Sequence, residues 1–299
     1  MAAQQIRHLR THVVVGTDGS ESANDAVAWA AREAKLRSLP LRVVHGYVWP
    51  YVHAPLGAAG YLEAGDGLRD APQRLLADAE QVARTAAPEV PVETTLVATS
   101  ATAALLEWSH DAALLVVGSR GLGGFSSLLL GSTAVQAAMY ASCPVVTVRE
   151  AETTEGVRPV VVGVDAPNHA VAALAFAYED ASLRRAPLVA VHAWTEPVST
   201  GPGDMLPLVY DPAEVQDDET RLLAELLAGW SEKYPDVPVT RRVERGRARD
   251  VLIEESHRAQ LVVVGARGVG GFRGLLFGSV SQAVLHHAHC PVAVVRAGD

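Results

Sequence analysis

Cysteine is scarce in this sequence, with only Cys143 and Cys290 among 299 residues. The two occupy equivalent positions, because each is followed by a proline and a valine. A disulfide between them stays open, but a buried thiol ahead of a strand is the commoner arrangement. We therefore expect two structural thiols and assign them no chemistry.

Positive charge and long apolar runs are also lacking. The chain has 25 Lys and Arg against 34 Asp and Glu, which gives a net charge of −9 and a pI near 5.7. A nucleic-acid partner is disfavoured because neutralising phosphates requires clustered Lys and Arg, and an anionic membrane surface is disfavoured for the same reason. No segment approaches the ~18 apolar residues of a membrane span, and residues 1–11 lack a signal-peptide core. We expect a cytoplasmic protein.

The chain does contain a glycine loop that occurs twice, at an offset of 147 residues. Gly118-Ser119-Arg120-Gly121 is separated by nine residues from Gly131-Ser132. Gly265-Ala266-Arg267-Gly268 is separated by the same nine residues from Gly278-Ser279. An apolar run precedes each loop, and a helix-like segment and a Cys-Pro pair follow it. The repeated unit is therefore strand, glycine loop, helix and strand.

The duplication extends over each half of the chain. The same offset relates Val13–Gly16 to Val160–Gly163 and His45 to His192. A length of 299 residues favours two domains at roughly 100–200 residues each, and a constant offset indicates full domains rather than small solenoid repeats. We predict a first domain over 1–150, a second over 158–299 and a polar linker over 151–157.

Apolar runs alternate with segments of helical spacing, which predicts an α/β fold with parallel sheets and right-handed crossovers. The predicted architecture is two tandem copies of an open five-stranded parallel sheet, order 3-2-1-4-5, with helices on both faces. In the first half we expect strands at 11–17, 41–48, 92–98, 114–117 and 145–148, helices at 20–38, 69–87, 101–110 and 132–140, and an exposed loop at 51–67. In the second half we expect strands at 159–164, 188–194, 239–243, 261–264 and 292–295, and helices at 168–185, 212–233, 248–258 and 279–288.

The glycine loops follow the fourth strand of each half, at the edge where parallel sheets bind ligands. Gly118 and Gly121 would let the backbone turn sharply and approach a ligand, since glycine reaches dihedrals that other residues avoid. Gly131-Ser132 then opens a helix, whose free N–H groups and positive dipole end favour an anion such as phosphate. The hydroxyls of Ser132 and Thr133 can add hydrogen bonds. In the second half Ser279 and Ser281 offer hydroxyls, whereas Val280 replaces Thr133.

Two better-known phosphate motifs are absent. A P-loop needs a lysine directly before the Ser or Thr that opens the helix, and neither Gly131-Ser132 nor Gly278-Ser279 is preceded by one. A dinucleotide-binding fingerprint should follow the first strand, but that position reads Thr-Asp-Gly-Ser-Glu-Ser from residue 17. The loops belong to another class.

Charged side chains supply further candidate contacts. Asp18 and Asp165 each end a first strand and could accept from a ribose hydroxyl or a base amine, approach a phosphate-bound Mg²⁺, or serve only as turn residues. Arg120 and Arg267 could contact phosphate or pair with a surface carboxylate. The histidines at 286, 287 and 289 suggest an exposed helix end more than a metal site, and no catalytic set stands out among the matched positions.

These features resemble the universal stress protein family in its tandem two-domain form. The family motif G-x2-G-x9-G-[ST] matches both loops completely, and the resemblance covers about 13–149 and 160–296. It implies one adenine nucleotide per half, usually ATP with Mg²⁺ bound through its phosphates. It also implies a role in stress survival or growth regulation, and halves that pack about a pseudo-two-fold axis through their fifth strands.

The resemblance implies particular ligand contacts in each half. Backbone groups of the second strand commonly hold the adenine, which points to Val43 or Val44 and to Val189 or Ala190. The expected nucleotide-binding residues are Asp18, Val44, Gly118, Arg120, Gly121, Gly131, Ser132, Thr133, Asp165, Ala190, Gly265, Arg267, Gly268, Gly278, Ser279 and Val280. No catalytic residue and no metal ligand is assigned to the chain itself.

Other functions remain open from the sequence. One is an enzyme, either a slow ATP hydrolase or an adenylating enzyme, although the Ser-Gly-Gly-x-Asp-Ser loop of adenylating relatives is not found after the first strand. Another is a binding module for AMP or cyclic AMP. The sequence also leaves open a homodimer of the tandem chain and the identity of a regulatory protein partner.

Overall fold

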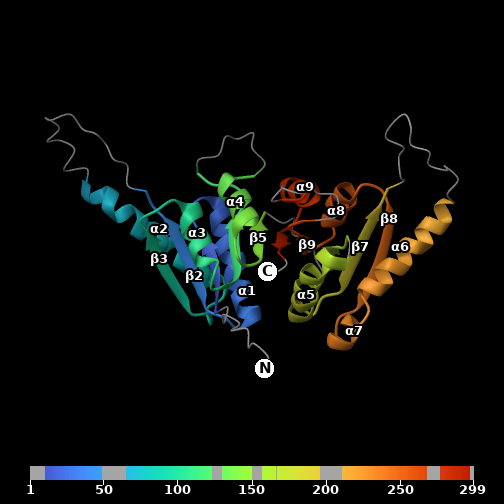
Figure 1. Cartoon of the computed structure of the whole chain (residues 1–299). Coiled ribbons are helices and arrows are strands. Elements are labelled where there is room, and N and C mark those ends of the chain that lie inside the picture. The colour runs from blue at the N-terminus through green and yellow to red at the C-terminus, as the bar shows by residue number, and fades with distance from the viewer. Residues whose placement is uncertain are drawn as a thin grey trace, which may run out of the picture. The chain divides into compact units, whose positions relative to one another are not determined.

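The computed structural model describes residues 11–48, 65–122, 130–149, 157–165, 167–195, 211–267 and 277–296. The chain forms two compact units, Met1–Glu150 and Ala151–Asp299 (Figure 1). Most of the predicted linker, residues 151–156, and most of the predicted loop at 51–67 lie outside the described residues.

Each unit contains a five-stranded parallel sheet. In the first unit the strands are β1 (His12–Gly16), β2 (Leu41–Gly46), β3 (Val92–Val97), β4 (Ala112–Gly118) and β5 (Val145–Val148), in the spatial order β3-β2-β1-β4-β5. In the second they are β6 (Val160–Gly163), β7 (Leu188–Trp194), β8 (Val239–Arg245), β9 (Leu261–Gly265) and β10 (Val292–Val295), in the order β8-β7-β6-β9-β10. The predicted order 3-2-1-4-5 is confirmed in each unit.

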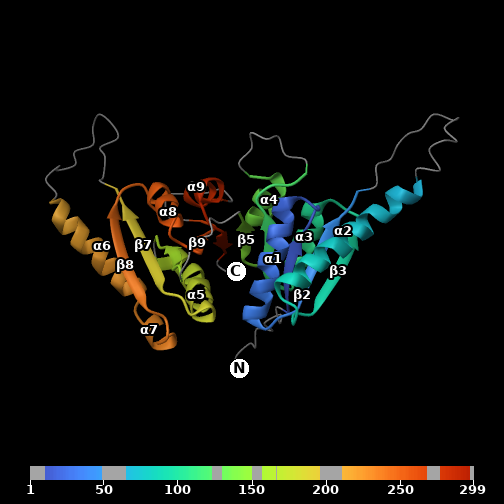
Figure 2. The same ribbon diagram turned by 180° about the vertical axis from the view of Figure 1, so that it is seen from behind.

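Helices cover both faces of each sheet (Figures 1 and 2). In the first unit α1 (Glu21–Arg37) packs beside α2 (Gly65–Ala86), and α3 (Ala101–Trp108) packs beside α4 (Ser132–Tyr140). The second unit has α5 (Pro167–Arg184), α6 (Pro212–Leu226), α7 (Trp230–Lys233), α8 (Ala248–Ser256) and α9 (Ser279–His287). Of these, α8 packs beside α9.

The central strands are valine-rich because helices bury both of their faces. Val13, Val14 and Val15 of β1 are at most 1% exposed, and the three valines that open β6 are fully buried. Cys143 and Cys290 are also buried, as expected. These rigid central strands hold in place the loops that leave their carboxyl ends.

Short side chains and caps define the helix after the first strand. Ser20 caps α1 by accepting a hydrogen bond from the Ala23 N–H at 3.2 Å, which satisfies one of the free amides of the first turn. Ala26, Ala30 and Ala34 are fully buried at helical spacing, so α1 can approach the sheet closely. The helix ends at Arg37, one residue before the predicted end at 38.

Two predicted boundaries are wrong. The single helix predicted over 212–233 is two helices, because Gly229 between α6 and α7 adopts a left-handed conformation with φ of 80°, which helical residues do not adopt. Helix α2 begins at Gly65, inside the predicted loop, and continues through Pro72. The remaining elements agree within a few residues, and α4, β5, β7 and β10 have the predicted bounds.

Candidate functional site

Each unit has a cavity at the carboxyl ends of its strands, where the loops after the first and fourth strands meet. We call them the first and the second cavity, after their units; their volumes are about 330 and 270 Å³. The first volume lies at the lower end of the range of small-molecule sites, roughly 300–1,000 Å³, and the second lies just below it. Each cavity is therefore large enough to take much of a nucleotide.

The first cavity brings together all eight residues predicted for the first half. The lining contains Asp18, Val44, Gly118, Arg120, Gly121, Gly131, Ser132 and Thr133. Apolar side chains that were not predicted complete the wall, notably Leu105 of α3 and Leu130. The lining of the cavity is thus partly polar and partly aliphatic.

The second cavity brings together six of the eight residues predicted for the second half. These are Asp165, Gly265, Arg267, Gly278, Ser279 and Val280. Gly268 lies outside the described residues. Ala190 does not line the cavity and is fully buried in β7. Val191, the residue that matches Val44 at the constant offset, lines it instead, because adjacent strand residues point to opposite faces.

Helix α4 begins at the first cavity with no side chain at its cap. Its N-cap is Gly131, and no side chain there accepts a hydrogen bond. The Gly131 N–H donates to the Ser119 carbonyl at 2.8 Å, and the Gly131 carbonyl accepts from the Val135 N–H at 3.2 Å. The amides of the first turn lie in the chain between these two bonded amides. Two of the residues that carry them, Ser132 and Thr133, line the cavity. The arrangement leaves amide donors at an open helix terminus.

Gly131 has no structural reason of its own to be glycine. Its φ of −73° suits any residue, and a Cβ added there would meet nothing closer than 3.6 Å. The same holds for Gly278, the N-cap of α9, which has a φ of −77° and no side-chain hydrogen bond. A Cβ added to Gly278 would meet nothing closer than 3.5 Å. In both units the absent side chain leaves room inside a cavity.

The other glycines of the first loop are required by packing. A Cβ on Gly118 would lie 2.7 Å from the Ser22 carbonyl oxygen, and one on Gly121 would lie 2.4 Å from Asp18 Oδ2. Neither glycine has a positive φ, which among the described glycines occurs only at Gly19 and Gly229. The predicted reason, access to unusual dihedrals, is therefore wrong for Gly118 and Gly121. Their small size lets the two loops approach one another.

Asp18 joins these two loops. Its Oδ1 accepts from the Ser20 N–H at 3.0 Å, within the loop after β1. Its Oδ2 accepts from the Leu122 N–H at 2.8 Å, in the loop after β4. The turn role that the sequence left open is thus present, and Asp18 also lines the cavity. Each carboxylate oxygen has a second acceptor position, so a turn role and a ligand role are compatible.

Two serines reinforce the contact between these loops in the first unit. Ser22 Oγ accepts from the Arg120 N–H at 3.3 Å and lies 3.4 Å from Ser119 Oγ. Ala266 occupies the position equivalent to Ser119. In the second unit a different hydroxyl is used, since Ser281 Oγ donates to the Gly265 carbonyl at 2.6 Å. Ser281 was predicted to donate a hydrogen bond to phosphate, but its hydroxyl donates to the loop itself.

A histidine on the second strand supports each cavity, and the sequence reasoning assigned it no role. His45 Nδ1 lies 2.8 Å from the Thr17 carbonyl oxygen, and His192 Nδ1 lies 2.9 Å from the Val164 carbonyl oxygen. Because a carbonyl only accepts, the ring nitrogen donates in both cases. Thr17 and Val164 line their cavities. The equal spacing of the two histidines was the signal that could have revealed this support.

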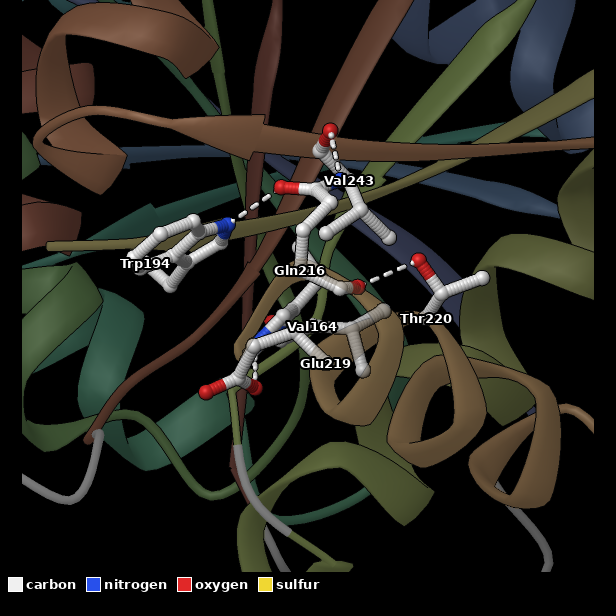
Figure 3. Close-up of polar contacts among 7 residues, drawn as sticks. Val164, Trp194, Gln216, Glu219, Thr220 and Val243 are labelled. Carbon is white, nitrogen blue, oxygen red and sulfur yellow. Dashed lines mark hydrogen bonds and ion pairs between the residues drawn. The ribbon is translucent and has the colours of Figure 1, made fainter. Parts of the chain in front are cut away.

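In the second unit a wider polar network anchors the same strand. Gln216 of α6 accepts from the Trp194 indole N–H at 2.7 Å and donates to the Val243 carbonyl at 3.2 Å, so that it joins β7 and β8 (Figure 3). One turn further along, Glu219 Oε2 lies 2.8 Å from His192 Nε2. Pro72 holds the position equivalent to Glu219, and a proline side chain cannot make this contact.

The histidines near the end of α9 form a separate surface feature. The rings of His289 and His257 stack with centroids 3.6 Å apart, and those of His286 and His287 lie 6.2 Å apart. Within the part of the chain that the structure describes, no group of three or more His, Cys, Asp or Glu could hold a metal ion. No helix among these same residues is long and apolar enough to cross a membrane.

Comparison with known proteins gives matches over nearly the whole chain. The model of the universal stress protein family matches twice, over residues 10–149 and 156–296. The universal stress protein Rv2623 of Mycobacterium tuberculosis is 39% identical over 297 residues, covering 95% of this chain and 96% of the relative. A universal stress protein of Mycolicibacterium smegmatis is 38% identical over 291 residues, with the same coverage.

A solved structure shows the same fold. The crystal structure of a universal stress protein from Archaeoglobus fulgidus superposes with a TM-score of 0.68 and covers 95% of this chain and 98% of that one. The two sequences are 19% identical, so the likeness concerns the fold alone.

Proposed function

The chain belongs to the universal stress protein family, and we propose that it is an ATP-binding regulator with one adenine-nucleotide site in each unit. The first and the second cavity are these sites. The protein acts in the cytoplasm in stress survival or growth regulation, and its occupancy by nucleotide is read by a protein partner.

The observation that carries this proposal is the pair of glycines that open α4 and α9. Gly131 and Gly278 have ordinary backbone angles and space for a Cβ, so neither conformation nor packing within the chain explains them. A bound group close to the helix terminus does. Amide donors and the positive end of the helix dipole favour a phosphate at that place.

The rest of each cavity suits the base and the sugar. The aliphatic wall, with Val44 and Leu105 in the first cavity and Val191 and Leu252 in the second, provides the apolar surface against which an adenine packs. Asp18 and Asp165 line the cavities beside the glycine loops, and a carboxylate there accepts from ribose hydroxyls.

Some backbone carbonyls of the second strand in each unit already accept a hydrogen bond within the protein. The Val44 carbonyl accepts from the Thr17 N–H at 3.0 Å, and the Val191 carbonyl accepts from the Val164 N–H at 2.8 Å. An adenine amine that bound there would use the second lone pair of the carbonyl. Val44 and Val191 are thus the matched candidates for adenine recognition.

A magnesium ion fits this site as a companion of the nucleotide. Near the helix termini the cavities offer backbone amides, hydroxyls and one carboxylate each. Mg²⁺ keeps several of its waters and commonly binds through substrate phosphates, so such a donor set suits an ion held mainly by ATP. When bound, the ion would neutralise phosphate charge, while Ser132, Thr133 and Ser279 hold the phosphates.

The proposal is tested by identifying what the protein binds. Mass spectrometry of nucleotide released by denaturing the purified protein should detect ATP or its hydrolysis product. Calorimetric titration with ATP, AMP and cyclic AMP then ranks the ligands, and we expect ATP to bind most tightly. The absence of ATP and AMP binding at millimolar concentration would overturn the proposal.

Turnover separates the regulator from an enzyme. We expect slow or absent ATP hydrolysis, because no general base or nucleophile has been assigned in either cavity. Hydrolysis well above the slow background that is abolished by Asp18→Asn would instead identify an ATP hydrolase.

A further inference from the structure

The histidine that supports the second cavity is held at both of its ring nitrogens. Nδ1 of His192 donates to the Val164 carbonyl at 2.9 Å, and Nε2 lies 2.8 Å from Glu219 Oε2 on α6. In the first unit His45 makes the equivalent of the first contact, but a proline occupies the position equivalent to Glu219. The same histidine is therefore held differently in the two units.

The contact between His192 and Glu219 must contain a proton. Because a carbonyl oxygen only accepts, Nδ1 of His192 carries a hydrogen, and in a neutral ring Nε2 would then be an acceptor. An ionised carboxylate also only accepts, and two acceptors repel one another at 2.8 Å. One proton therefore lies between the two groups, and it belongs to the ring because imidazole is the stronger base. We call these two residues the proton-sharing pair.

Burial and a neighbouring contact hold the pair in place. His192 is 6% exposed, and the Glu219 side chain is 27% exposed. One turn earlier on α6, Gln216 bonds to the Trp194 indole and to the Val243 carbonyl (Figure 3). The helix is thereby fixed to β7 and β8 beside the pair, so that little conformational entropy opposes the contact.

Other charged groups lie near the pair. Arg241 and Arg245 of β8 pair with the residues two before and two after His192, so their side chains project from the same face of the sheet. Both arginines stay charged at any physiological pH. On α5, Tyr178 interacts with Arg241 and has a pKa that burial raises, so it stays neutral. Among these groups only the proton-sharing pair can change its charge near neutral pH.

The proton-sharing pair reaches the second cavity through Val164. Val164 and the next residue, Asp165, both line that cavity. The Val164 amide donates to the Val191 carbonyl at 2.8 Å, and the Val164 carbonyl accepts from His192, so β7 fixes Val164 at both of its polar groups. A hydrogen bond from a charged donor is roughly twice as strong as a neutral one. Loss of the proton would therefore loosen the segment of the wall that contains Asp165.

Building on the proposed function, we propose that the proton-sharing pair makes nucleotide binding in the second cavity depend on pH. The protonated pair fixes Val164 and the cavity wall, so the affinity falls as pH rises and the proton is lost. His192 and Glu219 are positioning residues, because they act through Val164 and do not line the cavity. The first cavity, with a proline in place of the glutamate, lacks this response. The ratio of the two occupancies thus changes with pH.

The test measures ATP affinity by calorimetry between about pH 5.5 and 9, with Mg²⁺ present. The full chain carries Gly131→Ala to block the first cavity, or Gly278→Ala to block the second. ATP itself takes up a proton in the lower part of this range, but that change affects both cavities and cancels in the ratio of their affinities. We expect the affinity of the second cavity to fall about three- to tenfold relative to the first as pH rises, the effect of one weakened hydrogen bond.

Two variants of α6 separate the proton from the contact. In Glu219→Gln the amide can donate to Nε2 of a neutral His192 ring, so the contact remains without a titrating proton. This variant should fold, which thermal unfolding checks, and its second cavity should follow the pH profile of the first. Asp218→Asn removes a carboxylate one residue away, which pairs with Arg221 at the surface; it should keep the response of the unaltered protein.

The outcomes distinguish this inference from the proposed function. If ATP binds but the two cavities share one pH profile, or if Glu219→Gln keeps the response, the inference is overturned and the proposed function stands. Equal loss of the response in Glu219→Gln and Asp218→Asn would also overturn it, because the effect would then reflect the charge of α6 in general. If ATP binds to neither cavity at any pH, the proposed function itself fails.

Discussion

The first and the second cavity share their glycines and their aspartate but differ in the side chains around them. At the phosphate end Ser132-Thr133 of the first unit becomes Ser279-Val280. At the junction of the loops, Ser119 becomes Ala266, and Ser281 donates to the Gly265 carbonyl instead. At the N-cap of the helix that follows the third strand, Ser100 becomes Arg247. Under the proposed function, the common features are those that would hold a nucleotide, and the differences are those that would select among nucleotides.

The two units also differ in what supports them. His192 is held by Glu219 of α6, whereas Pro72 of α2 stands at the equivalent position. An aromatic stack of the buried Tyr178 with the half-buried Trp230 and Tyr234 in the second unit replaces three alanines of the first. Duplication therefore preserved the strand ends and glycine loops more strictly than the helices behind them.

The largest expected effect comes from comparing two glycines of one motif. Gly118→Ala should destabilise the first unit by about 2–3 kcal/mol, because its Cβ would meet the Ser22 backbone at 2.7 Å. Gly131→Ala should change stability by less than about 0.5 kcal/mol, because its Cβ meets nothing within 3.6 Å. Denaturant unfolding measures both variants. Equal destabilisation would refute the division of the motif into packing and ligand-facing glycines.

A slightly smaller effect is expected where the two units differ in backbone spacing. A Cβ on Gly46 would lie 2.6 Å from Ala101 Cα, so β2 and α3 approach very closely there. The equivalent residue of the second unit, Ala193, already carries a Cβ. Gly46→Ala should cost about 1–2 kcal/mol as the short α3 tilts away, and Ala193→Gly about 1 kcal/mol or less. A neutral Gly46→Ala in calorimetric unfolding would show that this spacing is unimportant.

Exchanging one hydroxyl tests the phosphate ends of the cavities against each other. Thr133→Val gives the first unit the residue of the second, and should weaken ATP binding there by about 1–1.5 kcal/mol through loss of a hydrogen bond to phosphate. Val280→Thr should strengthen binding in the second unit by a similar or smaller amount. Isothermal titration calorimetry detects both changes. Unchanged affinity in both variants would place the phosphates away from this helix position.

The smallest expected effect concerns Tyr178, the buried ring of the aromatic stack in the second unit. Desolvation raises the pKa of Tyr178, against a smaller lowering by Arg241, and the buried hydroxyl has no hydrogen-bond partner among the residues that the structure describes. The folded state holds this tyrosine neutral, so its stabilising effect is complete below the ordinary value of 10.0 and is lost as pH rises above it. Tyr178→Phe should be within about 1 kcal/mol of neutral at pH 7 and should reduce the alkaline loss.

The control for this pH effect is Tyr234→Phe, which removes a hydroxyl from a half-buried ring of the same stack. This variant should keep the alkaline loss of stability. Urea unfolding at a series of pH values between 8 and 11 measures it, and the same slope in both variants would exclude Tyr178 as the source.

Much of the fold could be predicted from sequence because central strands buried on both faces appear as unbroken apolar runs. Strand β5 and helix α4 have the predicted bounds, because Cys143-Pro144 stands directly before β5 and Gly131 directly before α4. The break at Gly229 could not be predicted by periodicity, since Leu223, Leu227 and Trp230 continue the apolar spacing across it. Only the backbone conformation shows that this glycine is left-handed.

For the candidate site, the sequence predicted which residues line the cavities better than it predicted why each residue is there. The glycine motif placed Gly118, Gly121 and Gly131 at one cavity, but the reasons for the three glycines differ, and that depends on neighbours nearly a hundred residues away. Val191 was missed although the constant offset of 147 residues leads to it directly from Val44.

The stoichiometry of ATP binding tests most directly the claim that each unit holds one nucleotide at a glycine-capped helix. Isothermal titration calorimetry should find two ATP molecules per chain in the unaltered protein, one in Gly131→Ala, one in Gly278→Ala and none in the double variant. The added methyl fills the space beside the helix terminus while leaving the fold intact. Two bound ATP molecules in either folded single variant, or none in the unaltered protein, would contradict this account.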